Sequence, residues 1–195
     1  MSYPLVQLGE LGELFQGLAI QSTLEPGLNS FRVINIRDLN QLEVHGQGLE
    51  FGQVDLTKVK PKHHLQTGDV LLTTRTRPLR AGVVQKSLLP ALAGQNLGVL
   101  RLHQNIAPLY IAGLLSSGYG QDLTNVVFNI SSVVPLISLT NLKSLPIPLP
   151  PLAEQKRLAE LMLQFETYQN LSQQILASKR NLLDNVLRNL ATDNT

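Results

Sequence analysis

Residues 145–160, LPIPLPPLAEQKRLAE, divide the chain into two parts of different character. Four prolines stand within positions 146–151. A helix interior would not tolerate them, so this stretch is predicted to be extended. Residues 152–190, which follow, contain neither proline nor glycine. Pro151 suits the first turn of a helix, and Glu154 complements the positive end of the helix dipole. The pattern predicts one helix that begins at this junction and runs nearly to the C-terminus.

The apolar residues of this predicted helix are spaced by three and four positions, as in a coiled coil. The helix would be ~58 Å long at 1.5 Å per residue, whereas a domain of ~150 residues has a radius of gyration of about 15 Å. Much of the apolar stripe would therefore face water unless another helix covered it. This favours a coiled-coil partner, from the same chain or a second one, over packing within one domain. The predicted dimerisation seam consists of Leu158, Leu161, Phe165, Tyr168, Ile175, Leu182 and Val186, interrupted by the polar Ser172 and Lys179.

The chain before the junction has the short β-rich segments and frequent turns of a mixed domain. Its predicted strands are residues 31–36, 69–74, 82–85 and 97–102, and its predicted helical segments are residues 107–116 and 138–142. A glycine pair at 118 and 120 is predicted to form a turn. We therefore expect an α+β protein, with a mainly β domain over residues 1–150 and one long C-terminal coiled-coil helix over residues 151–195.

The basic residues of the chain are concentrated in one segment. The net charge of the whole chain is only +2. Between Lys58 and Lys86 there are seven lysines and arginines against one acid, Asp69, a balance of +6. The rest of the chain has 9 basic and 13 acidic residues, a balance of −4. One concentrated basic segment on a nearly neutral protein suggests an anionic partner.

Several classes of protein are disfavoured by what the sequence lacks. With no cysteine, the chain has no disulfide or thiol chemistry, and a reducing compartment is favoured. The N-terminal MSYPLVQ does not resemble a signal peptide, and no stretch approaches the ~18 apolar residues of a membrane span, so we expect a cytoplasmic protein without a membrane partner. The glycine-rich phosphate loop and the serine-hydrolase elbow are absent. His63 and His64 are adjacent and lack a third ligand nearby, so no metal site is expected. We expect a non-catalytic chain.

The run PLPPLAEQ at residues 148–155, with a long leucine-rich helix behind it, resembles the boundary between target recognition domain and spacer helix in specificity subunits of type I restriction–modification enzymes. GDVLL at residues 68–72 and NLGVL at residues 96–100 resemble two strands of that family, and residues 109–121 resemble its short helix and loop. The resemblance covers nearly the whole chain. It implies a DNA target recognition domain over residues 1–150.

Members of that family usually have two recognition domains and two spacer helices, whereas this chain has one of each. The resemblance therefore implies a half-length subunit that forms a homodimer through two antiparallel helices. Two-fold symmetry would make both half-sites on double-stranded DNA the same, so the target would be an interrupted palindrome. The resemblance also implies a methyltransferase subunit as partner, which brings S-adenosylmethionine, and a restriction subunit that can join the complex. The chain itself would hold no cofactor.

The basic segment supplies most candidates for DNA contact. Arg75 and Arg77 are expected to contact bases or phosphates, because arginine can donate two hydrogen bonds to guanine. Three alternating lysines would share one face of a strand and could follow the phosphate backbone. Phosphate contacts are expected from Arg80, Lys58, Lys60 and Lys62, and base-edge contacts from Asn35, Arg37, Gln95 and Asn96. For each of these residues the alternative is a solvated charge or a turn amide.

A second class of function stays open from the sequence alone. A non-catalytic assembly protein could have the same coiled coil and use its β domain to bind another protein. If the family resemblance holds, exposed polar residues of the long helix are expected to dock the methyltransferase: Glu160, Glu166, Gln169 and Gln173.

Overall fold

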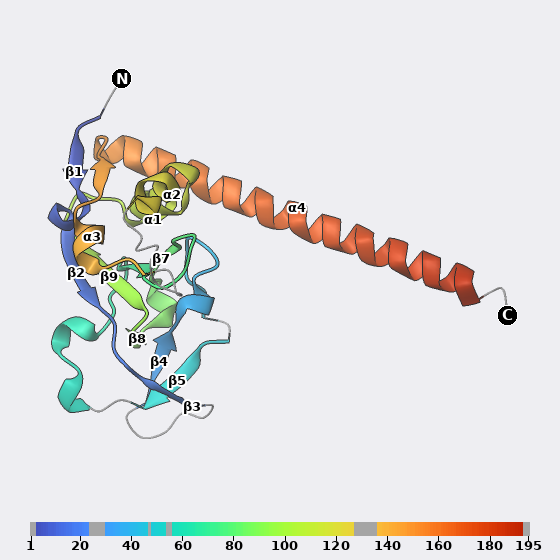
Figure 1. Ribbon diagram of the computed structural model, residues 1–195, viewed down its shortest axis with the longest axis horizontal. Helices are drawn as coiled ribbons and strands as arrows, with labels where there is room; N and C mark the ends of the chain where they lie inside the picture. The colour runs from blue at the N-terminus through green and yellow to red at the C-terminus, as the bar shows by residue number, and fades with distance from the viewer. Residues whose placement is uncertain (1–2, 24–29, 47, 54–55, 127–135, 193–195) are drawn as a thin grey trace.

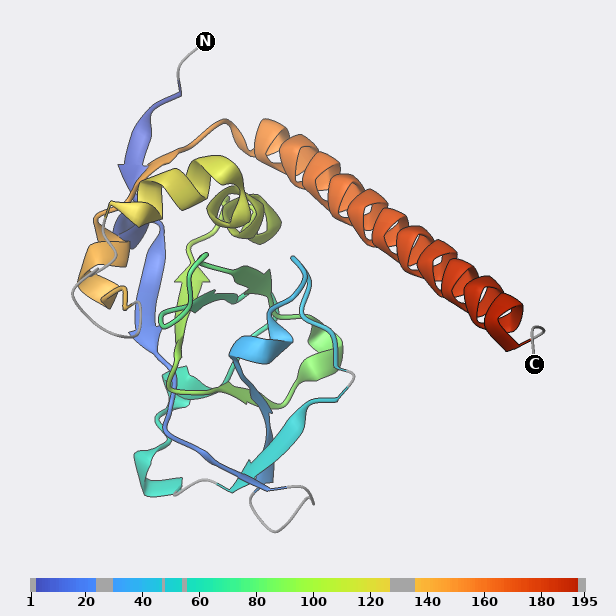
Figure 2. The ribbon, with the colours of Figure 1, turned by 45° about the vertical axis from the view of Figure 1, so that its right-hand side comes forward.

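The computed structural model describes residues 3–23, 30–46, 48–53, 56–126 and 136–192. A domain of small β-sheets and short helices is followed by one 41-residue helix, α4 (Leu152–Thr192), which extends away from the domain (Figure 1). Figure 2 shows the same arrangement from a direction 45° away. The expected α+β class is confirmed. No helix in the described ranges is both long and apolar enough to cross a membrane.

The described strands form three sheets, with orders β1-β10, β2-β9-β6-β7 and β3-β5-β4-β8. The strands are β1 (Leu5–Gln7), β2 (Gly12–Gln16), β3 (Gln21–Thr23), β4 (Ser30–Ile34), β5 (Glu50–Gln53), β6 (Val70–Thr73), β7 (Ala81–Val83), β8 (Ala91–Ala93), β9 (Leu97–Leu102) and β10 (Pro146–Pro148). The other helices are α1 (Pro108–Ser116), α2 (Gly118–Asn125) and α3 (Leu139–Lys143). All strand pairs are antiparallel except β4 with β8.

The central sheet β2-β9-β6-β7 lies between two hydrophobic cores. In β6, Val70 and Leu72 belong to the core that includes α1 and the start of α4, whereas Leu71 between them belongs to the other core. Successive strand residues point to opposite faces. The continuous apolar run of β6 therefore follows from burial on both faces.

The six strand and helix segments predicted for the first 150 residues are confirmed, with ends shifted by a few residues. The turn predicted at residues 118–120 is wrong, because Gly118 begins α2. Ser117 caps this helix by accepting a hydrogen bond from the Gly120 backbone N at 3.2 Å. A Cβ at Gly120 would lie 2.2 Å from the Leu114 carbonyl oxygen. This glycine therefore permits close packing of α2 on α1.

The shared strand face considered for the alternating lysines does not form. Lys58 ends a single 3₁₀ turn, η3 (Leu56–Lys58), and Lys62 lies in a second one, η4 (Pro61–His63). Pro61 has no backbone N–H and a fixed φ, so it begins a turn instead of continuing a strand ladder. The Lys60 backbone N donates to His63 Nδ1 at 3.1 Å and stabilises η4.

The proline-rich junction is extended, as predicted, and it fixes the start of α4 to the domain. β10 pairs with β1, and the Tyr110 hydroxyl donates to the Pro148 carbonyl at 2.6 Å. Gln155 in the first turns of α4 is only 2% exposed. Its Oε1 accepts from the Ala107 backbone N at 2.9 Å, and its Nε2 donates to the Pro150 carbonyl at 2.8 Å. The glutamine of the PLPPLAEQ run therefore joins three segments of the chain.

Replacing this glutamine by alanine is expected to lower the free energy of unfolding by about 2–4 kcal/mol, because Gln155→Ala leaves a buried donor and a buried acceptor without partners. Urea denaturation at one fixed protein concentration measures the loss. The matched control is Gln174→Ala, an exposed glutamine of the same helix, for which a change within about 0.5 kcal/mol is expected. Equal values for the two variants would contradict the assigned role.

Candidate nucleic-acid interface

Three of the predicted DNA-contacting residues lie on one loop between β6 and β7, the arginine loop (residues 74–80). The loop is closed at its base, where the Thr73 backbone N donates to the Arg80 carbonyl and the Arg80 backbone N donates to Thr73 Oγ1, each at 2.9 Å. Arg75, Arg77 and Arg80 are all exposed. A short, closed loop therefore presents three guanidinium groups to solvent.

Helix α2 holds one side of the arginine loop. Leu79 is buried in the core, and its backbone is bound in both directions by Gln121. Gln121 Oε1 accepts from the Leu79 backbone N at 3.0 Å, and Gln121 Nε2 donates to the Leu79 carbonyl at 2.8 Å. Asn125 Oδ1 accepts from Arg77 Nε at 2.9 Å. Helix α2 thus orders both the backbone of the loop and the direction of one guanidinium group.

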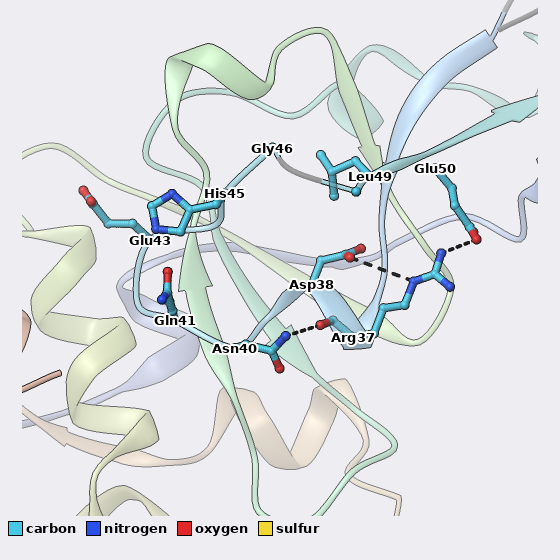
Figure 3. Close-up of a pocket in the computed structure, with 10 residues that line it drawn as sticks. Arg37, Asp38, Asn40, Gln41, Glu43, His45, Gly46, Leu49 and Glu50 are labelled. Carbon is cyan, nitrogen blue, oxygen red and sulfur yellow. Dashed lines mark hydrogen bonds and ion pairs between the residues drawn. The ribbon is translucent and has the colours of Figure 1, made fainter. Parts of the chain in front are cut away.

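Asn40 links the arginine loop to the predicted residue Arg37. Asn40 Oδ1 accepts from Arg80 Nη1 at 3.0 Å, and Asn40 Nδ2 donates to the Arg37 carbonyl (Figure 3). The Arg37 guanidinium contacts Glu50 and lies 3.9 Å from an Asp38 carboxylate oxygen. Its hydrogen bond to Glu50 and the charge of that carboxylate raise the pKa of Arg37.

Arg37 lines an open cavity of about 980 Å³ that also carries Asp38, Glu43, His45 and Glu50 (Figure 3). A phosphate in this cavity would meet three carboxylates. The cavity therefore disfavours the DNA backbone. The base-edge contact predicted for Arg37 stays a prediction.

Arg75, at the start of the arginine loop, lies near Gln95. Both line a cavity of about 390 Å³ with Gln16 and Ser138. Gln16 Nε2 donates to the Gln95 and Leu97 carbonyls, the latter at 3.0 Å, and this orders the turn before β9. The arrangement places a guanidinium and two amide side chains around one hollow, a set of donors and acceptors that suits the edges of bases.

Asn96 and Asn35 are the two asparagines among the predicted base-edge contacts. The Asn96 carbonyl accepts two hydrogen bonds from Thr74, while its side-chain Oδ1 is buried without a partner among the described residues. Asn35 precedes a 3₁₀ turn, η2 (Ile36–Asp38), where the Asp38 carboxylate accepts from its backbone N at 2.7 Å. Asn35 therefore belongs to a capped turn.

Lys62, in the first half of the basic segment, lies apart from the arginine loop. Lys62 Nζ is 3.5 Å from Glu13 Oε1 and 5.4 Å from the ring centre of Phe15, both on β2. Arg80, in contrast, leads directly into β7. β2 and β7 are the two edge strands of the central sheet, about 14 Å apart at ~4.8 Å per strand spacing. The teal segment of residues 56–63 and the light-blue segment of residues 36–45 accordingly lie on opposite sides of the domain in Figure 1.

The lone acid of the basic segment is neutralised inside the protein. Asp69 is only 2% exposed, and its two carboxylate oxygens accept from Arg101 Nε at 2.9 Å and Nη2 at 2.7 Å. This hydrogen bonding raises the pKa of Arg101. Beside the lysines, burial lowers the pKa of His63, and the charges of Lys62 and Lys60 lower it further. The charge that the segment presents to solvent at neutral pH is therefore positive.

The predicted seam of α4 is mostly uncovered. Leu158 is partly buried against the domain core. The six other seam side chains are 47–68% exposed: Leu161, Phe165, Tyr168, Ile175, Leu182 and Val186. The domain is covered instead by a different face of the helix, which includes Gln155, Ala159 and Met162.

One of the predicted docking residues is used within the chain. Glu166 Oε1 accepts from the Leu42 backbone N at 2.8 Å. Burial raises the pKa of this carboxyl, and the hydrogen bond from Leu42 opposes the shift. Glu160, Gln169 and Gln173 are exposed. These three side chains are therefore the more accessible of the four candidates for a docking surface.

The sequence gives no sign of the four amides that order the arginine loop and the turn before β9: Gln16, Asn40, Gln121 and Asn125. Their partners are 40 or more residues away, and an isolated loop amide carries no local signal of a tertiary contact. Within the described part of the chain, no three His, Asp or Glu side chains gather as a metal site requires.

The chain belongs to the family of the type I restriction modification DNA specificity domain, whose model matches residues 3–178. This confirms the resemblance inferred from the sequence. Members of the family are DNA-recognition subunits that are not themselves catalytic. A 195-residue chain with one such domain fits a half-length form. No curated protein matches the chain significantly.

Three solved structures have a similar fold. One is a chain from a study of complex assembly and conformational transition of the type I R-M system, at 22% identity and a TM-score of 0.60, which covers 92% of this chain and 40% of that one. The HsdS subunit from Thermoanaerobacter tengcongensis has 22% identity, a TM-score of 0.58 and the same coverage. The type I restriction-modification system S subunit from M. genitalium has 17% identity and a TM-score of 0.56, covering 91% of this chain and 43% of that one. The chain thus spans less than half the length of each.

Proposed function

We propose that this chain is the specificity subunit of a type I restriction–modification system and acts as a homodimer. Two recognition domains, one at each end of a pair of antiparallel α4 helices, would read an interrupted palindrome on double-stranded DNA. The dimer would dock a methyltransferase subunit that carries S-adenosylmethionine, and a restriction subunit could join. The complex is proposed to act in the cytoplasm, in keeping with a chain without cysteine.

The observation that carries this proposal is the uncovered heptad seam of α4. Beyond Glu166 the helix continues for 26 residues, about 39 Å, away from the domain. Large apolar side chains along one helix face are stable in water only when another surface covers them. A second copy of the same helix supplies a surface of matching length. Two copies would also provide the two recognition domains that the family usually has in one chain.

The arginine loop and its neighbours support the DNA-reading part of the proposal. Arg75 with Gln95 would contact base edges, and Arg77 and Arg80 would contact bases or phosphates from the other side of the loop. The lysines at the β2 edge would contact the backbone at a different point along the duplex. The exposed Glu160, Gln169 and Gln173 remain the proposed methyltransferase docking residues.

Selection of bound sequences from random DNA duplexes by the full chain tests the proposal. We expect enrichment of two inverted copies of one half-site at a fixed separation. Enrichment of a single uninterrupted site would contradict the symmetric dimer. No enrichment at any salt concentration, together with weak binding to all duplexes, would favour a protein-binding module instead.

A further inference from the structure

The α4 seam has two polar interruptions whose positions are informative. In heptad order the seam runs through Leu158, Leu161, Phe165, Tyr168, Ser172, Ile175, Lys179, Leu182 and Val186. Lys179 is the only charged member, and it lies between apolar seam residues that a partner helix would cover. A lysine at a buried coiled-coil position lowers stability but can specify register and orientation. The residue of the second helix that faces Lys179 therefore decides how two copies of the helix can pair.

We propose that Lys179 of each protomer lies across the Tyr168 ring of its partner, and that this pair sets the antiparallel orientation and the register of the dimer. The inference rests on the proposed homodimer and specifies its interface. Tyr168 is 68% exposed on the single chain, so its ring face is accessible to a second helix. A lysine ammonium over a tyrosine ring gains cation–π attraction, and its aliphatic stem covers the apolar surface.

One antiparallel register pairs every seam position from 161 to 186 with a seam position of the other helix. Its two-fold axis passes between residues 173 and 174. The facing pairs, one residue from each protomer, are Leu161 with Val186, Phe165 with Leu182, Tyr168 with Lys179 and Ser172 with Ile175. Both polar residues then face a residue of different character, and no two like charges meet in the seam.

A parallel in-register dimer would be much less favourable. In that arrangement each seam residue faces its own copy, so Lys179 would meet the partner's Lys179 in the covered interface. Two ammonium groups at one seam position repel each other and lose solvation. The lysine therefore acts against the parallel orientation.

Antiparallel registers shifted by one heptad are also disfavoured. A shift in one direction places Lys179 opposite Ile175, and a shift in the other places it opposite Leu161. Neither residue offers a ring or an acceptor to the ammonium group. The shift that places Lys179 opposite Ile175 also leaves Leu161 and Phe165 without a seam partner.

The same register also gives a partner surface to an apolar residue beside the seam. Leu183, which is exposed on the single chain, would lie about 3 Å along the axis from Met162 of the partner, on the same side of the helix pair. Met162 lines a groove with Phe165, Gly113 and Ser117, between α4 and the α1–α2 corner. The end of each helix would therefore cover apolar surface beside the recognition domain of its partner.

Distances between spin labels on the full-length dimer test this arrangement. The chain has no cysteine, so Gln174→Cys and Asn181→Cys each introduce one labelling site, and both lie on the same outward face of α4. The register predicts an axial separation of about 2 Å for labels at 174 and about 23 Å for labels at 181, at 1.5 Å per residue. A parallel dimer predicts the same short distance at both sites. A shift of one heptad changes each axial separation by about 8–10 Å.

The role of the lysine is tested by Lys179→Leu, with Lys179→Arg as the control that keeps a cation. We expect Lys179→Leu to remain dimeric but to give two distance populations at position 181, whereas Lys179→Arg keeps one. A single unchanged population in Lys179→Leu would overturn the role of the pair. Equal distances at the two labelling sites, or a shifted register, would overturn the pairing itself. A monomeric wild-type chain in sedimentation would instead overturn the proposed homodimer on which the inference rests.

Discussion

The double variant Phe165→Glu/Leu182→Glu is expected to be a folded monomer. Both side chains are more than 60% exposed on the single chain, so their replacement leaves the domain core intact. In the proposed dimer Phe165 of each protomer faces Leu182 of the other, so this pair occurs twice. The variant would therefore place two carboxylates opposite each other at each of two levels of the interface. Each covered large apolar side chain contributes about 1.5–3 kcal/mol. The loss of four such side chains is expected to raise the dimer dissociation constant at least ~10³-fold.

Sedimentation equilibrium of the variant at micromolar concentration measures this change, and circular dichroism checks that the domain is folded. The matched control is Gln173→Glu/Asn181→Glu, which adds the same charge on outward positions of the same helix. The control is expected to sediment like the wild type. A dimeric Phe165→Glu/Leu182→Glu variant would show that the seam is not the interface.

The second large effect is expected at the arginine loop. Arg75→Glu/Arg77→Glu should lower the affinity for the selected duplex at least ~10²-fold, because a good arginine–guanine pair contributes about 1–3 kcal/mol and each dimer loses two copies of both residues. Fluorescence anisotropy at two salt concentrations measures the affinity. If these arginines bind phosphate, the dependence of affinity on salt should also become shallower.

Arg157→Glu/Arg180→Glu is the control for this variant, since it makes the same change in net charge on exposed positions of α4. A small change, from general electrostatics alone, is expected for it. Equal losses for the two double variants would show that only net charge matters. An unchanged affinity for Arg75→Glu/Arg77→Glu would remove the loop from the interface.

The junction and the long helix were predictable because their signals are local. Prolines at 146–151 exclude a helix whatever the rest of the chain does. The absence of proline and glycine after them permits a helix of four or more heptads. The seam residues could be read from spacing alone, because one helix face recurs at fixed intervals. Even so, the two hydrogen bonds of Gln155 connect it to Ala107 and Pro150, and the pattern itself gives no sign of the distant Ala107.

The arrangement of the candidate site was less predictable, because it depends on sheet order. Residues 58–80 form one basic run in the sequence, and a prediction from the sequence places their charges on one surface. In the sheet, β9 and β6 lie between β2 and β7. Lys62 packs against β2 and Arg80 leads into β7, so the two residues lie at opposite edges of the sheet. The amides that order the arginine loop and the turn beside it come from the segment after η2, from α2 and from β2. Such contacts follow from tertiary packing and not from local pattern.

In the proposed complex, two copies of this chain form one DNA reader. Sedimentation equilibrium of the full chain with a duplex that carries the selected target tests this claim directly. We expect a complex that contains one duplex and two chains of 21.4 kDa each, and a dimer of the same two chains when DNA is absent. One chain per duplex, with a monomer in the absence of DNA, would contradict it.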